Sequence, residues 1–148
     1  MKLPNITILD EVDKRLRKKS SEVTFPLSTK DKQNIEDMIT YLKMSQIPEY
    51  EEEYDLRAGM GLAYIQMIYV GEGEGCLSIN REVEGIVPRF ARVTIEYLDL
   101  DGNTKRIRVR EDIAIAFQHE IDHLNGILFI DHIDPKNPYK NAEKYREI

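Results

Sequence analysis

Several features are scarce in this 148-residue sequence, and each scarcity excludes a class of protein. Tryptophan is absent and Cys76 is the single cysteine, so an internal disulfide framework is impossible. No run of about 18 apolar residues occurs, which argues against a membrane-spanning helix. Residues 1–10 show no cationic stretch followed by an apolar one, so they do not resemble a secretory signal. We therefore expect a cytoplasmic protein with no membrane partner, in a reducing compartment that leaves Cys76 free for chemistry.

An excess of positive charge is also lacking. The formal net charge is -6, which argues against a partner whose affinity comes from neutralised phosphates, so we predict no direct binding of nucleic acid. The basic run KRLRKK at 14–19 is interpreted as the solvated face of a short helix within 10–20. No repeat or linker divides the chain, and its length suits one hydrophobic core. We predict a single domain over residues 1–148.

Apolar periodicity predicts the helices and strands. Ser28 or Thr29 can cap a helix whose apolar residues recur at helical spacing, namely Ile35, Met38, Ile39 and Leu42. The aromatic and β-branched segment 64–70 predicts a strand. Alternation over 91–100, followed by Asp101-Gly102 and a second alternating segment, predicts a β-hairpin with a two-residue turn.

The segment 112–125 predicts a helix that ends at Gly126, with one apolar face made of Ile113, Phe117, Ile121 and Leu124. Antiparallel strands beside a helix with an apolar face indicate an α+β fold. The expected architecture is antiparallel or mixed β-sheets packed around this central helix.

The same helix carries the pattern that points to chemistry. His119, Glu120 and His123 form an HExxH sequence, and residues four apart share one helix face, so both imidazoles can reach one metal ion. Glu120 can take a proton from water as that water attacks a carbonyl carbon, and can pass it to the leaving nitrogen. The pattern alone therefore predicts a metal hydrolase.

A third metal ligand would distinguish between families of such hydrolases. Downstream of the helix the chain offers His132 and Glu143, as in zinc peptidases. Upstream it offers Cys76, whose thiolate is a strong ligand for a borderline divalent metal. A free cysteine is more often a small buried apolar residue, so these alternatives stay open on the residues alone.

Three motifs taken together resemble one known family. GMGLA at 59–63, EGCLS at 74–78 and QHEIDHLNG at 118–126 occur in the order of the three motifs of peptide deformylases. Further similarity, at Leu16-Arg17-Lys18, in 41–46 and in 89–93, matches the longer-chain form of Gram-positive bacteria and their relatives. The likeness covers nearly the whole chain.

The resemblance implies removal of the formyl group from the initiator methionine of nascent polypeptides, near the ribosome, by a monomeric enzyme. It implies one divalent metal, natively Fe²⁺ and replaceable by Zn²⁺, Ni²⁺ or Co²⁺, held by Cys76, His119 and His123. Glu120 would be the acid and base, and the backbone N–H of Leu77 and the side chain of Gln66 would stabilise the oxyanion. The implied substrate-binding residues are Met60, Gly61, Glu74, Gly75, Ile115 and Ala116.

The sequence departs from the family between Ala63 and Glu72. Gln66 has the spacing of the family's oxyanion glutamine but different neighbours, and a considerably longer stretch normally separates that glutamine from EGCLS. Either the chain is shortened, or the printed sequence omits residues; we favour omission, because losing central strands would leave backbone groups unpaired. Two alternative functions follow: an HExxH zinc peptidase, and an inactive shortened homologue that binds peptide N-termini.

Overall fold

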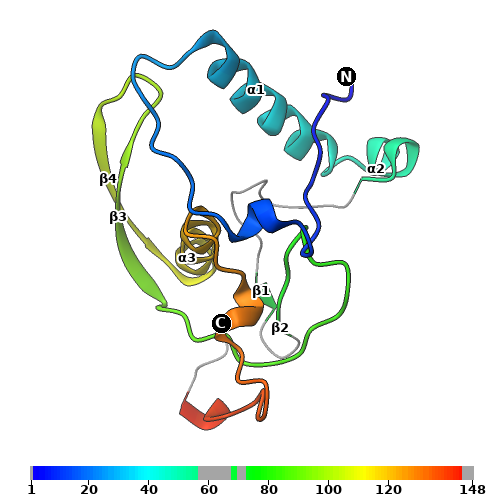
Figure 1. The fold of residues 1–148 in the computed structure, drawn as a ribbon, viewed down its shortest axis with the longest axis vertical. Helices are drawn as coiled ribbons and strands as arrows, with labels where there is room; N and C mark the ends of the chain where they lie inside the picture. Colours follow the sequence, from blue (N-terminus) through cyan, green and yellow to red (C-terminus); the bar gives the residue numbers. More distant parts are fainter. Residues whose placement is uncertain (1, 57–67, 70–72, 145–148) are drawn as a thin grey trace.

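The computed structural model describes residues 2–56, 68–69 and 73–144 (Figure 1). Three predictions from the sequence lie wholly or largely outside these residues. They are the GMGLA motif with Met60 and Gly61, the position of Gln66, and most of the strand predicted over 64–70. Within the described part, β1 (Ile68–Tyr69) pairs antiparallel with β2 (Gly73–Glu74).

Helix α1 (Thr29–Met44) begins at the predicted cap. The Ser28 hydroxyl accepts a hydrogen bond from the backbone N–H of Asp31 at 3.1 Å, and the Asp31 carboxylate accepts one from the N–H of Ser28 at 3.3 Å. This capping box satisfies two backbone donors that a helix N-terminus otherwise leaves unpaired. Of the predicted stripe, Ile39 is exposed, whereas Met38 and Leu42 pack against the buried Tyr41 and Met44.

Two apolar clusters hold the EGCLS segment from opposite sides. The first joins Leu77 to the C-terminal half of α1, to residues 3–8 and to α2 (Pro48–Tyr54), a short helix that starts with a proline at a position needing no N–H donor. The second joins Ile79 to Leu128, Phe129 and Ile133, which belong to or flank the 3₁₀ helix η2 (Phe129–His132). Alternate residues after Cys76 are thus anchored in different clusters, which fixes the position of its backbone.

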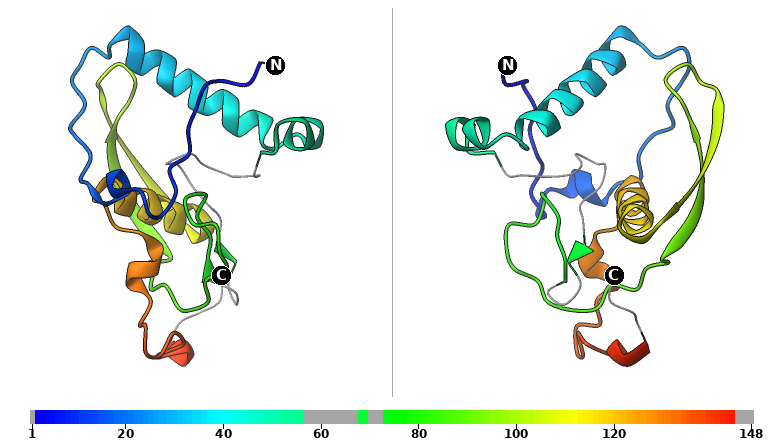
Figure 2. Two further views of the ribbon diagram at one scale, coloured as in Figure 1. Left: turned by 45° about the vertical axis from the view of Figure 1, so that its right-hand side comes forward. Right: turned by 180° about the vertical axis from the view of Figure 1, so that it is seen from behind.

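The predicted hairpin consists of β3 (Arg92–Leu98) and β4 (Thr104–Arg110). The prediction of a two-residue turn at Asp101-Gly102 is wrong, because Leu98 pairs with Thr104 and five residues connect the strands. The Asp99 carboxylate closes this loop by accepting hydrogen bonds from the N–H groups of Asp101 and Asn103 at 3.0 and 2.9 Å. The hairpin runs along one side of α3, and its tip lies at the same end of the molecule as the start of α1 (Figure 2).

Helix α3 (Glu111–Leu124) confirms the predicted central helix. Its end is set by Gly126, which has a φ of +75°; the N–H of Gly126 bonds to the carbonyl of His123, and that of Ile127 to the carbonyl of Asp122. These two bonds form a Schellman motif.

The apolar face predicted for α3 is wrong. Ile113, Ile121 and Leu124 are 52%, 45% and 51% exposed, and the buried residues of the helix are Ala114, Ile115, Ala116, His119 and Glu120. Ile115 is buried whereas Ile113, of the same size, is exposed, so the size of an apolar side chain does not decide which face of α3 is buried.

The N-terminal segment crosses the C-terminal end of α3. The N–H of Ser20 bonds to the carbonyl of Leu124 at 2.7 Å, and Arg17 forms an ion pair with Asp131. A Cβ on Gly126 would lie 2.6 Å from backbone atoms of Arg17, so only glycine permits this approach. The short helix expected within 10–20 is the 3₁₀ helix η1 (Lys14–Arg17), and a last 3₁₀ turn, η3, spans Ala142–Lys144. None of the described helices has the length and apolar character needed to cross a bilayer.

Candidate metal centre

Helix α3 brings the two motif histidines together, as their spacing predicts. The rings of His119 and His123 meet edge to face with centroids 4.6 Å apart, and their Nε2 atoms are 2.9 Å apart. Phe129 stacks on the other side of His119 at a centroid distance of 6.2 Å. His119 is only 2% exposed, so its ring has little freedom to turn away.

Cys76 completes the cluster from the EGCLS segment. Its Sγ lies 3.3 Å from Nε2 of His123, and the potential ligand atoms of Cys76, His119 and His123 all lie within 4.8 Å of one another. Nitrogen and sulfur ligands sit about 2.0–2.3 Å from a tetrahedral metal ion, which separates neighbouring ligand atoms by roughly 3.3–3.8 Å. The three side chains therefore fit one divalent ion with a small outward adjustment, and their donor set suits a borderline metal.

The protonation of the cluster follows from its charges. Burial raises the pKa of the Cys76 thiol, but hydrogen bonds and charge interactions with His119 and His123 outweigh this and lower it from 9.0 to about 6. Burial lowers the pKa of His119, yet the interactions with Cys76 and Glu74 raise it from 6.5 to about 10. These interactions favour a thiolate at Cys76 and one positive charge beside it.

An outer network holds His119 in place. Nδ1 of His119 bonds to the carboxylate of Glu74, which is 4% exposed. Arg89 bonds to both oxygens of that carboxylate, through Nη2 at 2.9 Å and Nε at 3.1 Å. Burial would raise the pKa of Glu74, but the bonds from His119 and Arg89 hold it below its usual value. A carboxylate on Nδ1 leaves Nε2 of His119 directed at the cluster, as in many metal sites.

Arg89 also connects Glu74 to Asp122 of α3. Its Nη1 lies 2.6 Å from Asp122, and the same oxygen of Asp122 lies 2.7 Å from Nε2 of His132. His132 is therefore engaged by Asp122, and within the described ranges the residues that converge as metal ligands are Cys76, His119 and His123. The third side chain at the cluster is the cysteine, not His132 or Glu143.

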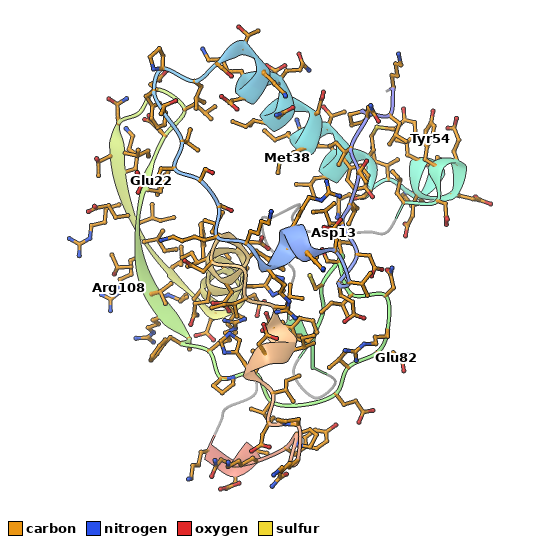
Figure 3. The ribbon with its side chains drawn as sticks, in the orientation of Figure 1. Asp13, Glu22, Met38, Tyr54, Glu82 and Arg108 are labelled. Carbon is orange, nitrogen blue, oxygen red and sulfur yellow. The ribbon has the colours of Figure 1, made fainter. Side chains whose placement is uncertain are left out.

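A pocket of about 340 Å³ opens beside the cluster. Glu120, 6% exposed, lines it together with Cys76, Leu77 and the two histidines. The opposite wall comes from the N-terminal segment and α1, including Ile8, Leu9, Leu16 and Met38; Figure 3 labels Met38. Of the other candidate residues, Ile115 and Ala116 are buried one turn before His119, Gly75 is exposed, and Glu74 lies against His119.

Sequence reasoning missed the roles of Arg89 and Asp122 in the network. Asp122 sits inside the HExxH motif, but nothing in the motif reveals that it faces an arginine 33 positions upstream. The one signal in the sequence for a role of Arg89 is that it lies only a short distance along the chain from the EGCLS segment. Its partners become evident only when β2, α3 and η2 are placed together.

Replacing Arg89 with methionine should lower the free energy of unfolding by about 3–5 kcal/mol, because it leaves the buried Glu74 carboxylate without its guanidinium. The side chains of Arg89 and Glu74 are 6% and 1% exposed. Arg81→Met is the matched control: Arg81 pairs with Glu11 at 3.0 Å but is 55% exposed, so its loss should cost at most about 1 kcal/mol. Chemical denaturation measures the free energy of unfolding of both variants. Equal losses would contradict the prediction that the buried Arg89–Glu74 pair stabilises the fold more than the exposed pair does.

Helix α3, its HExxH residues and the converging thiol define an α+β protein whose HExxH histidines and cysteine are placed to hold a metal ion. Comparison with known proteins narrows this class. The family model for polypeptide deformylases matches residues 65–139. A peptide deformylase of Latilactobacillus sakei is 40% identical over 169 residues, covering 89% of this chain and 91% of the relative, and one of Macrococcus caseolyticus is 39% identical over 161 residues, covering 84% and 88%.

Solved structures agree with these relatives. The peptide deformylase of Thermotoga maritima superposes with a TM-score of 0.59 at 28% identity, covering 87% of this chain and 97% of that chain. For the peptide deformylase of Plasmodium falciparum the TM-score is 0.63 at 27% identity, with 93% and 92% covered. The chain belongs to the peptide deformylase family.

The match to Latilactobacillus sakei spans 169 residues, more than the 148 of this chain, so that relative has residues with no counterpart here. Their position between Ala63 and Glu72 stays a prediction.

Proposed function

We propose that this chain is a metal-dependent hydrolase that removes the N-formyl group from the initiator methionine of nascent polypeptides and releases formate. The convergence of Cys76, His119 and His123 beside a pocket that Glu120 lines is the observation that carries the proposal. Family membership supplies the reaction class. The family is metal-dependent, and Cys76, His119 and His123 would hold one ion, Fe²⁺ in the native enzyme, with Zn²⁺, Ni²⁺ or Co²⁺ able to replace it.

When bound, the metal would supply Lewis acidity, polarising the formyl carbonyl and making water more acidic. Glu120 takes the proton of the attacking water as its oxygen bonds to the formyl carbon. The C–N bond then breaks, and Glu120 returns the proton to the departing amine nitrogen. The N–H of Leu77 donates to the oxygen on which negative charge develops.

Glu74 and Arg89 support this chemistry without touching the substrate. Their bonds fix the orientation of the His119 ring, so that its Nε2, once deprotonated, would direct its lone pair at the cluster. We assign Ile115 and Ala116 to the wall of the methionine pocket, and Gly75, Met60 and Gly61 to the peptide-binding cleft. Gln66 would be the second oxyanion donor. We also propose that the chain forms one domain and acts as a monomer in the cytoplasm, near the ribosome.

A formyl-methionyl tripeptide tests the function directly. Metal-loaded protein prepared without oxygen should release one formate for each free amine, and removal of the metal by a chelator should abolish release until metal is restored. Turnover that survives a chelator shown to strip the metal would contradict the proposal. Peptide binding without formate release would indicate the inactive homologue instead.

A further inference from the structure

The register of the β-hairpin gathers arginines on one face. Arg92 pairs with Arg110, Thr94 with Arg108, and Glu96 with Arg106. Residues paired across antiparallel strands project to the same side, so these four arginines share one face, and all four are exposed. We call this set, Arg92, Arg106, Arg108 and Arg110, the arginine face.

The opposite face of the hairpin packs toward α3. Its residues Val93, Ile95, Ile107 and Val109 are half-buried or buried, and α3 contacts both strands. The arginine face therefore points away from the body of the protein, and Figure 3 labels Arg108 on this outer side.

The described part of the chain compensates the charge of the arginine face only in part, through Glu96 opposite Arg106. Glu96 is the one acidic residue of β3 and β4, and none of the four arginines forms a salt bridge with a described residue. Arg92 and Arg110 stand directly opposite each other, an arrangement that destabilises a strand pair. A hollow of about 270 Å³ lies at this point, lined by Arg92, Arg108, Val109 and Arg110. An anionic partner would relieve the repulsion.

The spacing of the arginine face suits a row of phosphates. Guanidinium groups bind phosphate through two parallel hydrogen bonds, and side chains on one strand face repeat about every 7 Å, which suits successive phosphates of one nucleic acid strand. Phe90 lies two residues before Arg92 with its side chain 75% exposed, and Gln118 fixes its backbone through bonds of 2.9 and 2.8 Å. Such a fixed, exposed ring can stack on a base.

We propose that the arginine face binds the phosphate backbone of RNA. The net charge of -6 conceals this surface, because most acidic residues lie outside the hairpin, for example in 49–55. This inference stands apart from the catalytic site, since neither the metal ligands nor the pocket residues belong to the hairpin. Binding through this face would hold the enzyme on an RNA-rich particle while its catalytic site stays accessible to substrate.

Fluorescence anisotropy with a short labelled single-stranded RNA of mixed sequence tests the proposal. The Arg92→Gln/Arg108→Gln variant should bind about 10–100-fold more weakly at about 50 mM salt. The magnitude of its slope of log affinity against log salt should fall by about 1.4, because each of two lost phosphate contacts contributes about 0.7 on a single strand. Lys30→Gln/Lys32→Gln on α1 makes the same change in net charge on exposed lysines and should bind as the unaltered protein does.

Thermal stability and formate release show whether the arginine variant differs from the unaltered protein in anything besides RNA binding. The arginine variant should unfold at an equal or higher temperature, because it removes the Arg92–Arg110 repulsion, and its activity on a formylated tripeptide should not change. Equal RNA affinity in the unaltered and arginine-variant proteins, or equal loss in the lysine control, would overturn the proposal. So would tighter binding of poly-glutamate or of anionic lipid vesicles than of RNA at the same charge concentration.

Discussion

Glu120→Gln should lower kcat for formate release by roughly 10²–10⁴-fold while leaving the metal in place. Glutamine keeps the length and shape of the side chain, which is 6% exposed, but an amide cannot accept the proton of the attacking water. Formate release and metal content are measured on the same sample, so that loss of chemistry is separated from loss of the ion.

Glu143→Gln is the matched control for this variant. Glu143 is exposed in η3 and was the carboxylate that a zinc-peptidase ligand set could have used. We expect it to retain full activity and metal. Turnover by Glu120→Gln near that of the unaltered enzyme would remove Glu120 from its assigned role, whereas loss of the metal in Glu120→Gln would make it a ligand or a folding residue.

Cys76→Ala should weaken metal binding by more than about 100-fold, because changes outside the ligand set alone cost about 10–100-fold. The thiolate is the one anionic ligand of the three, and its neighbours already lower its pKa to about 6. Competition with a chromogenic chelator measures the affinity without relying on activity.

His132→Ala separates the two possible ligand sets. A peptidase-like site would lose its metal in this variant and keep it in Cys76→Ala. Since His132 contacts Asp122 and lies outside the cluster, we expect His132→Ala to change metal affinity by less than Cys76→Ala does. The reverse order would contradict the deformylase ligand set.

Short sequence patterns predicted those helix ends and strands whose positions depend on interactions within a few residues. The Ser28 cap, the two alternating strands and the glycine after α3 each satisfy a backbone requirement within a few residues, so their positions could be read from the chain. The HExxH spacing likewise guaranteed that His119 and His123 share a face once α3 formed. Cys76 entered the set through the likeness of its motif, because no spacing rule links it to a histidine 43 residues later.

Contacts between segments far apart in the sequence determined the features that short patterns did not predict. Within α3, Ile113 and Ile121 are exposed whereas Ile115 is buried, so the face that packs depends on where the hairpin and other segments contact the helix. Asp99 bridges a five-residue loop where the Asp-Gly pair suggested two. The link from Glu74 through Arg89 to Asp122 depends on three segments meeting, which no single window of sequence contains.

The crossing of the N-terminal segment over the end of α3 bears on how the protein is made. Arg17 meets Asp131, and Ser20 meets Leu124, so residues made early bind residues made more than a hundred positions later. Until α3 and η2 have been made, the N-terminal segment lacks these two contacts, although residues 3–8 can already pack on α1. Contacts of such long sequence separation slow folding. The pocket can therefore close only after η2 has been made, so a partly synthesised chain cannot yet act on its substrate.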